Sequence, residues 1–246
     1  MPQPNPIAFT IFGTDIMWYA ICVTLGIVTA AIIVYWRAPK HGMTGDQMLT
    51  YIVICVPVGI IGARAYYVLF NWSWYAGDIV RILNIREGGL AIHGGLILGL
   101  CCGAFLCRLR RNRPLDLLDL CMPAIALAQS IGRWGNYFNS EAHGGPTDLP
   151  WGVFIDGQTY HPTFLYESIW CLILFFVLLY VDNHRKFEGQ VLLLYGILYS
   201  CERILVEALR TDSLMIGSLK QAQVFSITVV VVCTIFYVIL NKKSKK

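Results

Sequence analysis

The sequence predicts an all-α integral membrane protein, folded as one transmembrane domain of seven helices. Composition is the first reason: 57% of the 246 residues are hydrophobic and 14% are charged, whereas a soluble domain carries about 25% charged residues. The second reason is a series of long apolar runs along the chain. The third is that basic residues gather in particular segments between these runs, as they do in membrane proteins of defined orientation.

The apolar runs give the expected spans, because a helix that crosses a bilayer needs roughly 20 apolar residues. Six runs are clear and one is weaker. In chain order, the seven cover residues 17–36, 48–70, 89–107, 115–131, 162–181, 189–208 and 221–240. The weak run is 115–131, which contains Asp116, Asp119 and Pro123. We include it because the charge distribution requires it.

The distribution of basic residues sets the expected orientation. Twelve of the 19 Lys and Arg residues lie near residue 40, at 108–113, at 184–186 and at 242–246. With seven spans, these four segments share one side of the membrane, whereas six spans would divide them. Positive segments stay in the cytoplasm, so we expect an external N-terminus and a cytoplasmic C-terminus. The net charge of +4 then reflects orientation, and it does not indicate a nucleic-acid partner.

Several classes of segment and site are not indicated. Residues 1–16 lack the basic stretch of a signal peptide, and the first apolar run is long enough to remain as a span. The nine cysteines lie in or beside apolar runs, without metal-ligand spacing. We expect them to act as small hydrophobic residues, and we expect no metal and no organic cofactor.

The segment GRWGNYFNSEAHGG, at residues 132–145, is the strongest indication of a site. It carries Arg133, Asn136, Asn139, Glu141 and His143 directly after an apolar run. Each polar group near hydrocarbon costs several kcal/mol unless it has a partner. A reaction site is the leading explanation for such a cluster.

Other ionisable residues lie inside or at the ends of the runs. They are Arg64, His93, His161, Glu167, Glu202, Arg203, Glu207 and Arg210. Structural ion pairs are one explanation, since Arg203 and Glu207 are four residues apart and share a helix face. His93 could equally be a hydrogen-bonded residue at a helix end. With seven spans, however, most of these residues lie toward the outer ends of their helices, which favours one outward-facing polar cavity.

Such a cavity suits an anionic lipid. A guanidinium is always charged and binds phosphate through two parallel hydrogen bonds. Asparagines and the tyrosines Tyr19, Tyr67 and Tyr166 can orient a polar headgroup, and His93 is a candidate proton acceptor. No Walker loop and no nucleophile elbow is present in the sequence.

At this point the residues resemble a known family. The segment at 132–145 is similar to the signature of prolipoprotein diacylglyceryl transferases, Arg-x-Gly-Asn-aromatic-x-Asn-x-Glu-x-x-Gly. Further matches follow in register: Trp18-Tyr19, residues 64–70, His93-Gly94-Gly95, His161-Pro162, Tyr166-Glu167, and Arg203 with Glu207 and Arg210. The chain departs from the family at Ser140, where Gly is frequent, at Tyr137, where Phe is common, and at Thr163, where Ser is frequent.

The resemblance implies an activity. The family transfers the diacylglyceryl group of phosphatidylglycerol to the lipobox cysteine thiol of a prolipoprotein signal peptide, forms a thioether and releases glycerol phosphate. This is the first step of bacterial lipoprotein maturation. It would place the chain in the cytoplasmic (plasma) membrane, with its site toward the outer leaflet. A lipid or solute transporter with an anionic-lipid site is the alternative, and a non-catalytic scaffold that binds anionic lipid is a further one.

The resemblance also assigns roles. Arg133 and Arg203 would hold the phosphate, and His93 or Tyr19 would help to deprotonate the thiol. The remaining expected substrate-binding residues are Asn136, Asn139, Glu141, Gly144, Arg64, Tyr67, Glu207, Arg210, His161, Tyr166 and Glu167. Within this set, Glu207 would orient Arg203, and Arg64 would add positive charge near the entrance.

Overall fold

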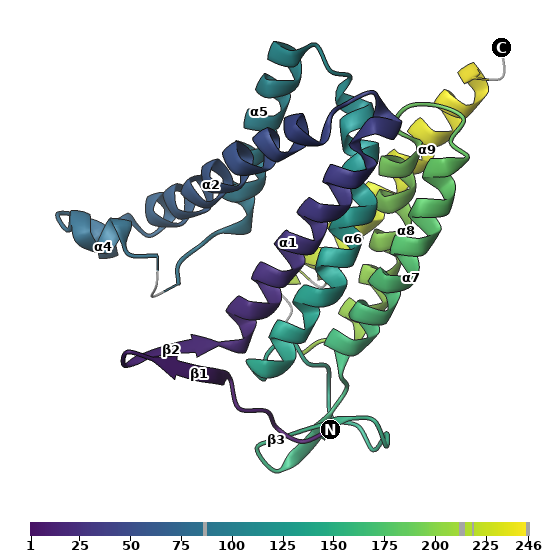
Figure 1. The fold of residues 1–246 in the computed structure, drawn as a ribbon. Helices are drawn as coiled ribbons and strands as arrows, with labels where there is room; N and C mark the ends of the chain where they lie inside the picture. Colours follow the sequence, from purple (N-terminus) through teal and green to yellow (C-terminus); the bar gives the residue numbers. More distant parts are fainter. Residues whose placement is uncertain (86–87, 212–214, 218, 245–246) are drawn as a thin grey trace. The chain divides into compact units, whose positions relative to one another are not determined.

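The computed structural model describes residues 1–85, 88–211, 215–217 and 219–244, and its chain is mostly helical (Figure 1). The elements in order are β1 (Ile7–Ile11), β2 (Thr14–Met17), α1 (Trp18–Arg37), η1 (Ala38–His41), α2 (Gly45–Phe70), α3 (Trp72–Tyr75), α4 (Ile79–Leu83), α5 (Ile92–Arg110), α6 (Pro114–Phe138), β3 (Val153–Ile155), β4 (Gln158–Tyr160), α7 (Thr163–Asn183), α8 (Gln190–Leu209), β5 (Met215–Ile216), β6 (Leu219–Lys220) and α9 (Gln221–Ser244). The basic residues Lys245 and Lys246 lie outside the described residues.

Within this described part, six helices are long and apolar enough to cross a membrane. They are Trp18–His41, Gly45–Phe70, His93–Arg110, Pro114–Phe138, Thr163–Asn183 and Gln221–Ser244. The structure therefore agrees with an all-α, multi-pass membrane protein. The weak run at 115–131 is among the six. The run at 189–208 is the one that falls short: it forms α8, which carries Glu202, Arg203 and Glu207.

Several helices begin or end a few residues away from the ends of the apolar runs. The largest difference is at α6, which continues past residue 131 to Phe138. Arg133 and Asn136 are therefore helical, because their polar side chains find partners, described below, that apolarity alone could not reveal. At the third run, residues 89–91 precede the helix, and α5 continues to Arg110. Short antiparallel hairpins, β1–β2, β3–β4 and β5–β6, were also not predicted.

The chain divides into two compact units, each described by itself: Tyr35–Pro114, and Met1–Val34 with Leu115–Lys246. In the first unit, α2 packs against α5 through glycines. A Cβ at Gly62 would lie 2.5 Å from the Gly94 carbonyl oxygen, and a Cβ at Gly95 would lie 3.3 Å from that of Gly59. Such close approach of two backbones is typical of small residues in membrane helices.

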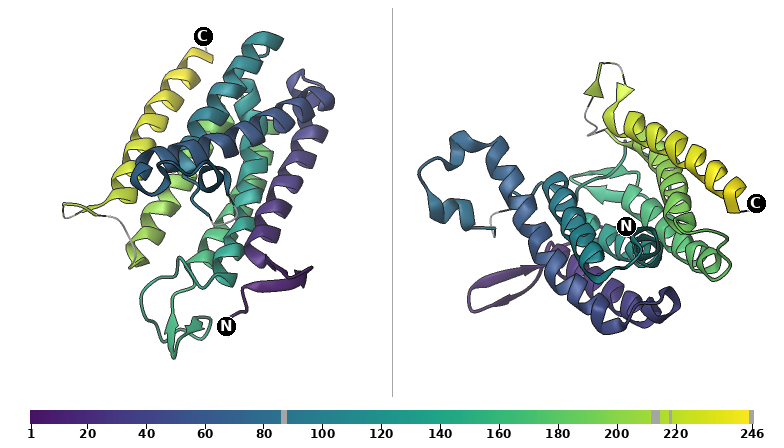
Figure 2. Two further views of the ribbon diagram at one scale, coloured as in Figure 1. Left: turned by 90° about the vertical axis from the view of Figure 1, so that its left-hand side faces the viewer. Right: turned by 90° about the horizontal axis from the view of Figure 1, so that it is seen from above.

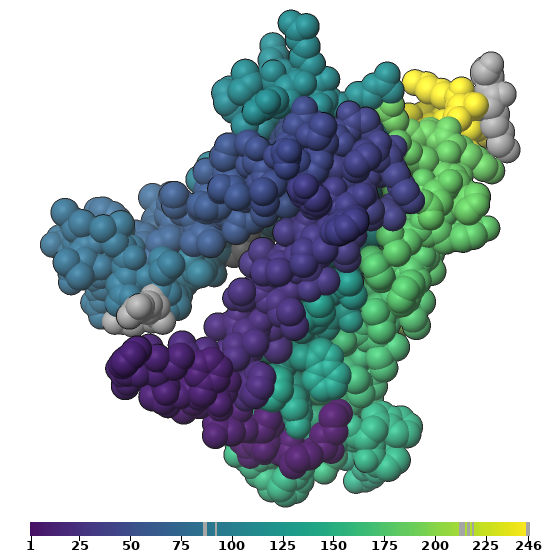
Figure 3. Space-filling view, viewed as in Figure 1, coloured from purple at the N-terminus to yellow at the C-terminus, as the bar shows by residue number. Residues whose placement is uncertain are grey.

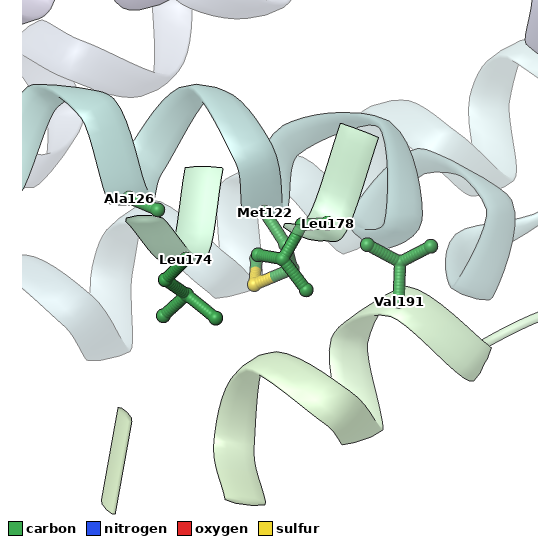
Figure 4. Packing of buried hydrophobic residues seen from close by; sticks show 5 residues of the cluster. All are labelled: Met122, Ala126, Leu174, Leu178 and Val191. Atoms are coloured by element: carbon green, nitrogen blue, oxygen red, sulfur yellow. The ribbon is translucent and has the colours of Figure 1, made fainter. Parts of the chain in front are cut away.

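The second unit contains α1, α6, α7, α8 and α9. Helix α1 lies beside α6 (Figure 1), where a Cβ at Gly26 would lie 3.0 Å from the Ala128 carbonyl oxygen. Helices α8 and α9 lie side by side (Figure 2). The buried core of α6, α7 and α8 consists of Met122, Ala126, Leu174, Leu178 and Val191 (Figure 4).

Asp119 is one of the residues that made the apolar run at 115–131 weak, and it has a structural role in this unit. Its side chain is fully buried and accepts hydrogen bonds from Gly189 N at 2.7 Å and Leu192 N at 2.9 Å. These amides belong to the start of α8, where a helix leaves N–H groups unsatisfied and favours negative charge. Arg185 forms an ion pair with Asp116 and lies 3.6 Å from Asp119. The two acids therefore join α6 to the α7–α8 connection.

The N-terminal residues bind the β3–β4 hairpin. The amino group of Met1 donates to Gly152 O at 2.5 Å, and Phe154 N donates to Met1 O at 2.8 Å. Tyr137, at the end of α6, donates to Pro2 O at 2.9 Å. In the space-filling view the purple N-terminal segment lies against this region (Figure 3). The contacts hold the chain start beside the signature segment.

Candidate active site

Three helices of the second unit bring four charged side chains together. Glu167 of α7 lies between two arginines: Arg203 of α8 donates through Nη1 to its Oε1, and Arg133 of α6 places Nη1 3.0 Å from its Oε2. Arg203 also donates through Nη2 to Glu207 at 2.7 Å. We call Arg133, Glu167, Arg203 and Glu207 the arginine cluster.

Burial explains why the cluster is arranged in this way. Glu167 is fully buried, and a buried carboxylate is tolerated only with charged partners. The side chains of Arg133 and Arg203 remain 20% and 18% exposed. The carboxylate therefore anchors both guanidinium groups from the inside while part of each stays accessible. Two positive and two negative charges leave the cluster neutral, and an added anion would meet the exposed arginine edges.

Tyr199 also belongs to this site, although the sequence pattern did not predict it. Its hydroxyl accepts a hydrogen bond from Arg133 Nη2 at 3.3 Å. Tyr199 precedes Arg203 by four residues and so shares its helix face. The four-residue spacing from Arg203 was the feature of the sequence that could have predicted this position of Tyr199. The ring of Tyr195 stacks on that of Tyr199, with 5.5 Å between the ring centroids. The hydroxyl of Tyr195 donates a hydrogen bond to Gln129 Oε1 on α6 at 2.9 Å.

The signature segment forms a tight polar turn after α6. Asn136 donates from Nδ2 to Glu141 Oε1 at 2.9 Å, and Asn139 reaches the same oxygen at 3.4 Å. The backbone N–H of Glu141 returns to Asn136 O at 3.0 Å. The three residues form one hydrogen-bonded group, in which Asn139 and Glu141 are exposed.

Two residues of this turn have left-handed backbone conformations. Ser140 has a φ of 53° and Ala142 a φ of 56°. Residues with a Cβ adopt this region at a cost of roughly 1–2 kcal/mol, which glycine avoids. Ser140 stands where the signature resembled by this segment frequently has Gly. The left-handed φ of this position explains why glycine suits it. Ala142 is held by its carbonyl, which accepts a hydrogen bond from Thr163 Oγ1.

Gly144 joins the turn to α7 and α8. Its N–H donates to His161 O at 2.9 Å, and Gly145 N donates to Leu209 O at 2.9 Å. A Cβ at Gly144 would lie 2.7 Å from the Cβ of His161. Gly144 also pairs with Arg210 in an isolated antiparallel bridge. Close backbone contact therefore explains this glycine, and it brings His161 and Arg210 to the signature turn.

Two predicted tyrosines also lie at this end of the second unit. Tyr166 accepts a hydrogen bond from Trp151 Nε1 at 3.1 Å, and its hydroxyl lies 3.4 Å from His161 Nδ1. Tyr19 of α1 packs on the backbone of Gly135, where a Cβ would lie 2.8 Å from the tyrosine ring. The structure thus brings Tyr19, His161 and Tyr166 to the signature.

Arg64 lies in the first unit and has a structural environment. Its guanidinium donates to five backbone carbonyls at 2.7–2.9 Å, those of Arg81, Ile82, Asn84, Gly88 and Gly89. An arginine has five N–H donors, so every one is used. The predicted contribution of Arg64 to headgroup binding stays a prediction, whereas its contacts hold the segment after α3.

The other predicted residues of the first unit are Tyr67 and His93. Tyr67 makes an edge contact with Tyr75 at 6.3 Å between ring centroids. His93 is exposed in the first turn of α5, and its ring centroid lies 6.1 Å from that of Tyr66. The predicted convergence of His93 with the arginine cluster joins residues of different units and stays a prediction.

The cysteines and the possible metal-binding side chains can be located in the described part of the chain. All nine cysteines, which lie in the described part, are free thiols. Among the described residues, no group of three or more His, Cys, Asp or Glu side chains is placed to hold a metal ion.

The chain is similar over nearly its whole length to proteins of one family. A model of the family described as prolipoprotein diacylglyceryl transferase matches residues 6–239. A Clostridioides difficile protein named phosphatidylglycerol–prolipoprotein diacylglyceryl transferase is 49% identical over 97% of this chain and 96% of its own length. Proteins of the same name from Finegoldia magna and Clostridium novyi are 46% and 45% identical, each over 98% of this chain and over 96% and 98% of their own lengths. The chain belongs to the prolipoprotein diacylglyceryl transferase family.

Proposed function

We propose that this chain transfers the diacylglyceryl group of phosphatidylglycerol to the lipobox cysteine of a prolipoprotein signal peptide. Full-length similarity to relatives whose names state phosphatidylglycerol and prolipoprotein supports the substrates. The observation that carries the chemistry is the pair of partly exposed arginines fixed on one buried carboxylate, Glu167. The transporter and scaffold alternatives receive no support from the family or from its relatives' names.

In this reaction a C–S bond forms and the bond between the glyceryl carbon and a phosphate oxygen breaks. The thiol proton leaves, and the phosphate oxygen takes the electron pair of the broken bond. Arg133 and Arg203 stabilise the charge that builds on the departing glycerol phosphate, since preorganised donors act most strongly where charge develops. The thiolate is the effective nucleophile, so His93 or Tyr19 takes the proton.

The remaining residues shape the substrate pocket. Asn136, Asn139 and Glu141 present polar atoms to the headgroup from the signature turn. Glu167 and Glu207 hold the two arginines in position. Gly144, His161, Tyr166 and Arg210 contribute to the pocket, Tyr67 orients the headgroup, and Arg64 adds positive charge near the entrance.

We further propose one transmembrane domain over residues 1–246, with spans near 17–36, 48–70, 89–107, 115–131, 162–181, 189–208 and 221–240. In this topology α8 is the sixth span in chain order, and its charges are tolerated because Arg203 is neutralised by Glu167 and Glu207. The N-terminus is external, the C-terminus is cytoplasmic, and the site faces the outer leaflet of the bacterial cytoplasmic membrane. Cysteine labelling of tails and loops tests each side.

A transfer assay tests the activity. Purified protein is incubated with phosphatidylglycerol and a lipobox peptide, and the peptide mass is measured. We expect a gain of one diacylglyceryl group on the peptide cysteine and none on a peptide with Cys→Ala. An unmodified peptide, in a preparation shown to be folded, would contradict the proposal. A protein that binds phosphatidylglycerol without transfer would instead be a scaffold.

A further inference from the structure

Glu202 is a buried carboxyl group that the reaction described above does not use. Only 4% of the surface of Glu202 is exposed. Neither carboxyl oxygen has a hydrogen-bond partner among the described residues. Buried polar groups are nearly always hydrogen-bonded, and an exception requires an explanation.

Glu202 lies on the face of α8 that packs against α7. Trp170 of α7 donates from Nε1 to Leu198 O at 3.2 Å, and Glu202 follows Leu198 by four residues, one turn along the same face. Its carboxyl interacts electrostatically with Glu167, Arg133 and Arg203. Glu202 therefore borders the arginine cluster.

Titratable groups of the neighbouring helices α7 and α9 also lie near this part of α8. From α7, Cys171 also interacts electrostatically with Glu202 and is fully buried. On α9, Cys233 lies against Gly196, and Tyr237 accepts a hydrogen bond from Gln190. Gly196 and Gln190 both precede Glu202 on α8. Lys220, before α9, donates to carbonyls at the end of α8, including Glu207 O at 2.7 Å. Tyr19 of α1 packs on the Gly135 side of α6.

The charge balance of the arginine cluster indicates whether the carboxyl group of Glu202 is ionised or protonated. Arg133 and Arg203 are already neutralised by Glu167 and Glu207. An ionised Glu202 would give the five residues a net charge of −1, in a buried place without hydrogen bonds. A carboxylate in such surroundings costs several kcal/mol and takes up a proton instead. A protonated Glu202 leaves the cluster neutral.

We propose that Glu202 carries a proton at neutral pH and acts as a positioning residue that keeps the arginine cluster able to receive an anionic phosphate. This inference rests on the proposed function. Binding of a phosphodiester adds one negative charge. Loss of the Glu202 proton adds a second to the same cluster and weakens binding. The affinity for the anionic lipid therefore falls as pH rises and Glu202 ionises.

Infrared spectroscopy tests the protonation directly. The full chain is placed in phosphatidylcholine vesicles at pH 7, and the carbonyl band of protonated carboxylic acids is recorded. We expect E202Q to lose intensity in this band, whereas D148N, an exposed loop variant, retains it. Equal bands in the wild type and E202Q would overturn the proposal. Thermal unfolding establishes that both variants are folded.

Transfer kinetics test the consequence. For the wild type we expect KM for phosphatidylglycerol to rise several-fold above neutral pH with little change in kcat. For E202Q we expect KM to stay level over that range, and E202D should restore the rise. The same pH dependence in the wild type and E202Q would overturn the proposal. If the wild type transfers nothing, the proposed function fails, and the infrared experiment still decides the protonation of Glu202.

Discussion

Oε2 of Glu167, on α7, lies 3.0 Å from Nη1 of Arg133, on α6. The contact is an ion pair without an aligned hydrogen bond, because this oxygen accepts none among the described residues. The other oxygen accepts from Arg203 on α8. A single carboxylate thus links three helices, and it sets the distance between two arginines that belong to different parts of the chain.

We expect Glu167→Gln to destabilise the protein by about 3 kcal/mol, because two partly buried cations lose their shared buried partner. Transfer should be lost as well, since the arginines are no longer held in place. Thermal unfolding and the peptide assay measure the two effects. Asp148→Asn is the matched control, since it removes an exposed carboxylate. Equal melting temperatures for the two variants would show that Glu167 does not hold the helices.

Arg133→Ala should abolish transfer while the protein still folds and inserts. Arg133→Lys should restore only part of the activity, because an ammonium cannot donate two parallel hydrogen bonds to a phosphate. The peptide assay, together with gel-filtration elution in detergent, measures activity and folding. Near-normal turnover of folded Arg133→Ala would exclude the phosphate role.

His93→Gln separates the two candidate bases. If His93 takes the thiol proton, the variant lacks the proton acceptor, and transfer should be much slower than in the wild type. Tyr19→Phe is the companion variant, and the peptide assay measures both. An unchanged rate for His93→Gln, with loss of activity in Tyr19→Phe, would assign the proton to Tyr19.

Ser140→Gly should stabilise the protein by up to about 1 kcal/mol, because glycine adopts the left-handed φ of 53° without the Cβ penalty. The matched control is Ser73→Gly in the helical α3, which should be neutral or destabilising. Thermal unfolding ranks the variants. A lower melting temperature for Ser140→Gly would mean that the serine makes a contact that outweighs its backbone strain.

Arg64→Met should loosen the segment after α3, because five backbone carbonyls lose their donor. Faster hydrogen exchange at residues 79–85 is the expected result. Arg81→Ala removes an arginine of the same segment, whose side chain donates to Trp74 O at 3.3 Å, and should have a smaller effect. Unchanged exchange in Arg64→Met, with loss of lipid binding, would favour the headgroup role predicted from the sequence.

The sequence by itself determined the membrane class, most of the helices and the family. Apolar length and charge content carry that information along the chain, without reference to distant contacts. The signature residues and their register with Arg203 and Glu207 were likewise evident. Boundaries were less accurate where polar residues continue a helix, as at residues 132–138, because composition does not show which polar groups have partners.

Only the tertiary structure decided how the charges are paired. Arg203 with Glu207 was foreseeable from spacing, but Glu167 as the shared partner of Arg133 and Arg203 depends on how three helices pack. The same holds for Arg64, whose partners are backbone carbonyls rather than acidic side chains. It also holds for Glu202, whose carboxyl oxygens are buried without a hydrogen-bond partner among the described residues. A side chain's identity is written in the sequence, whereas its partners and its burial are set by packing between segments far apart in the chain.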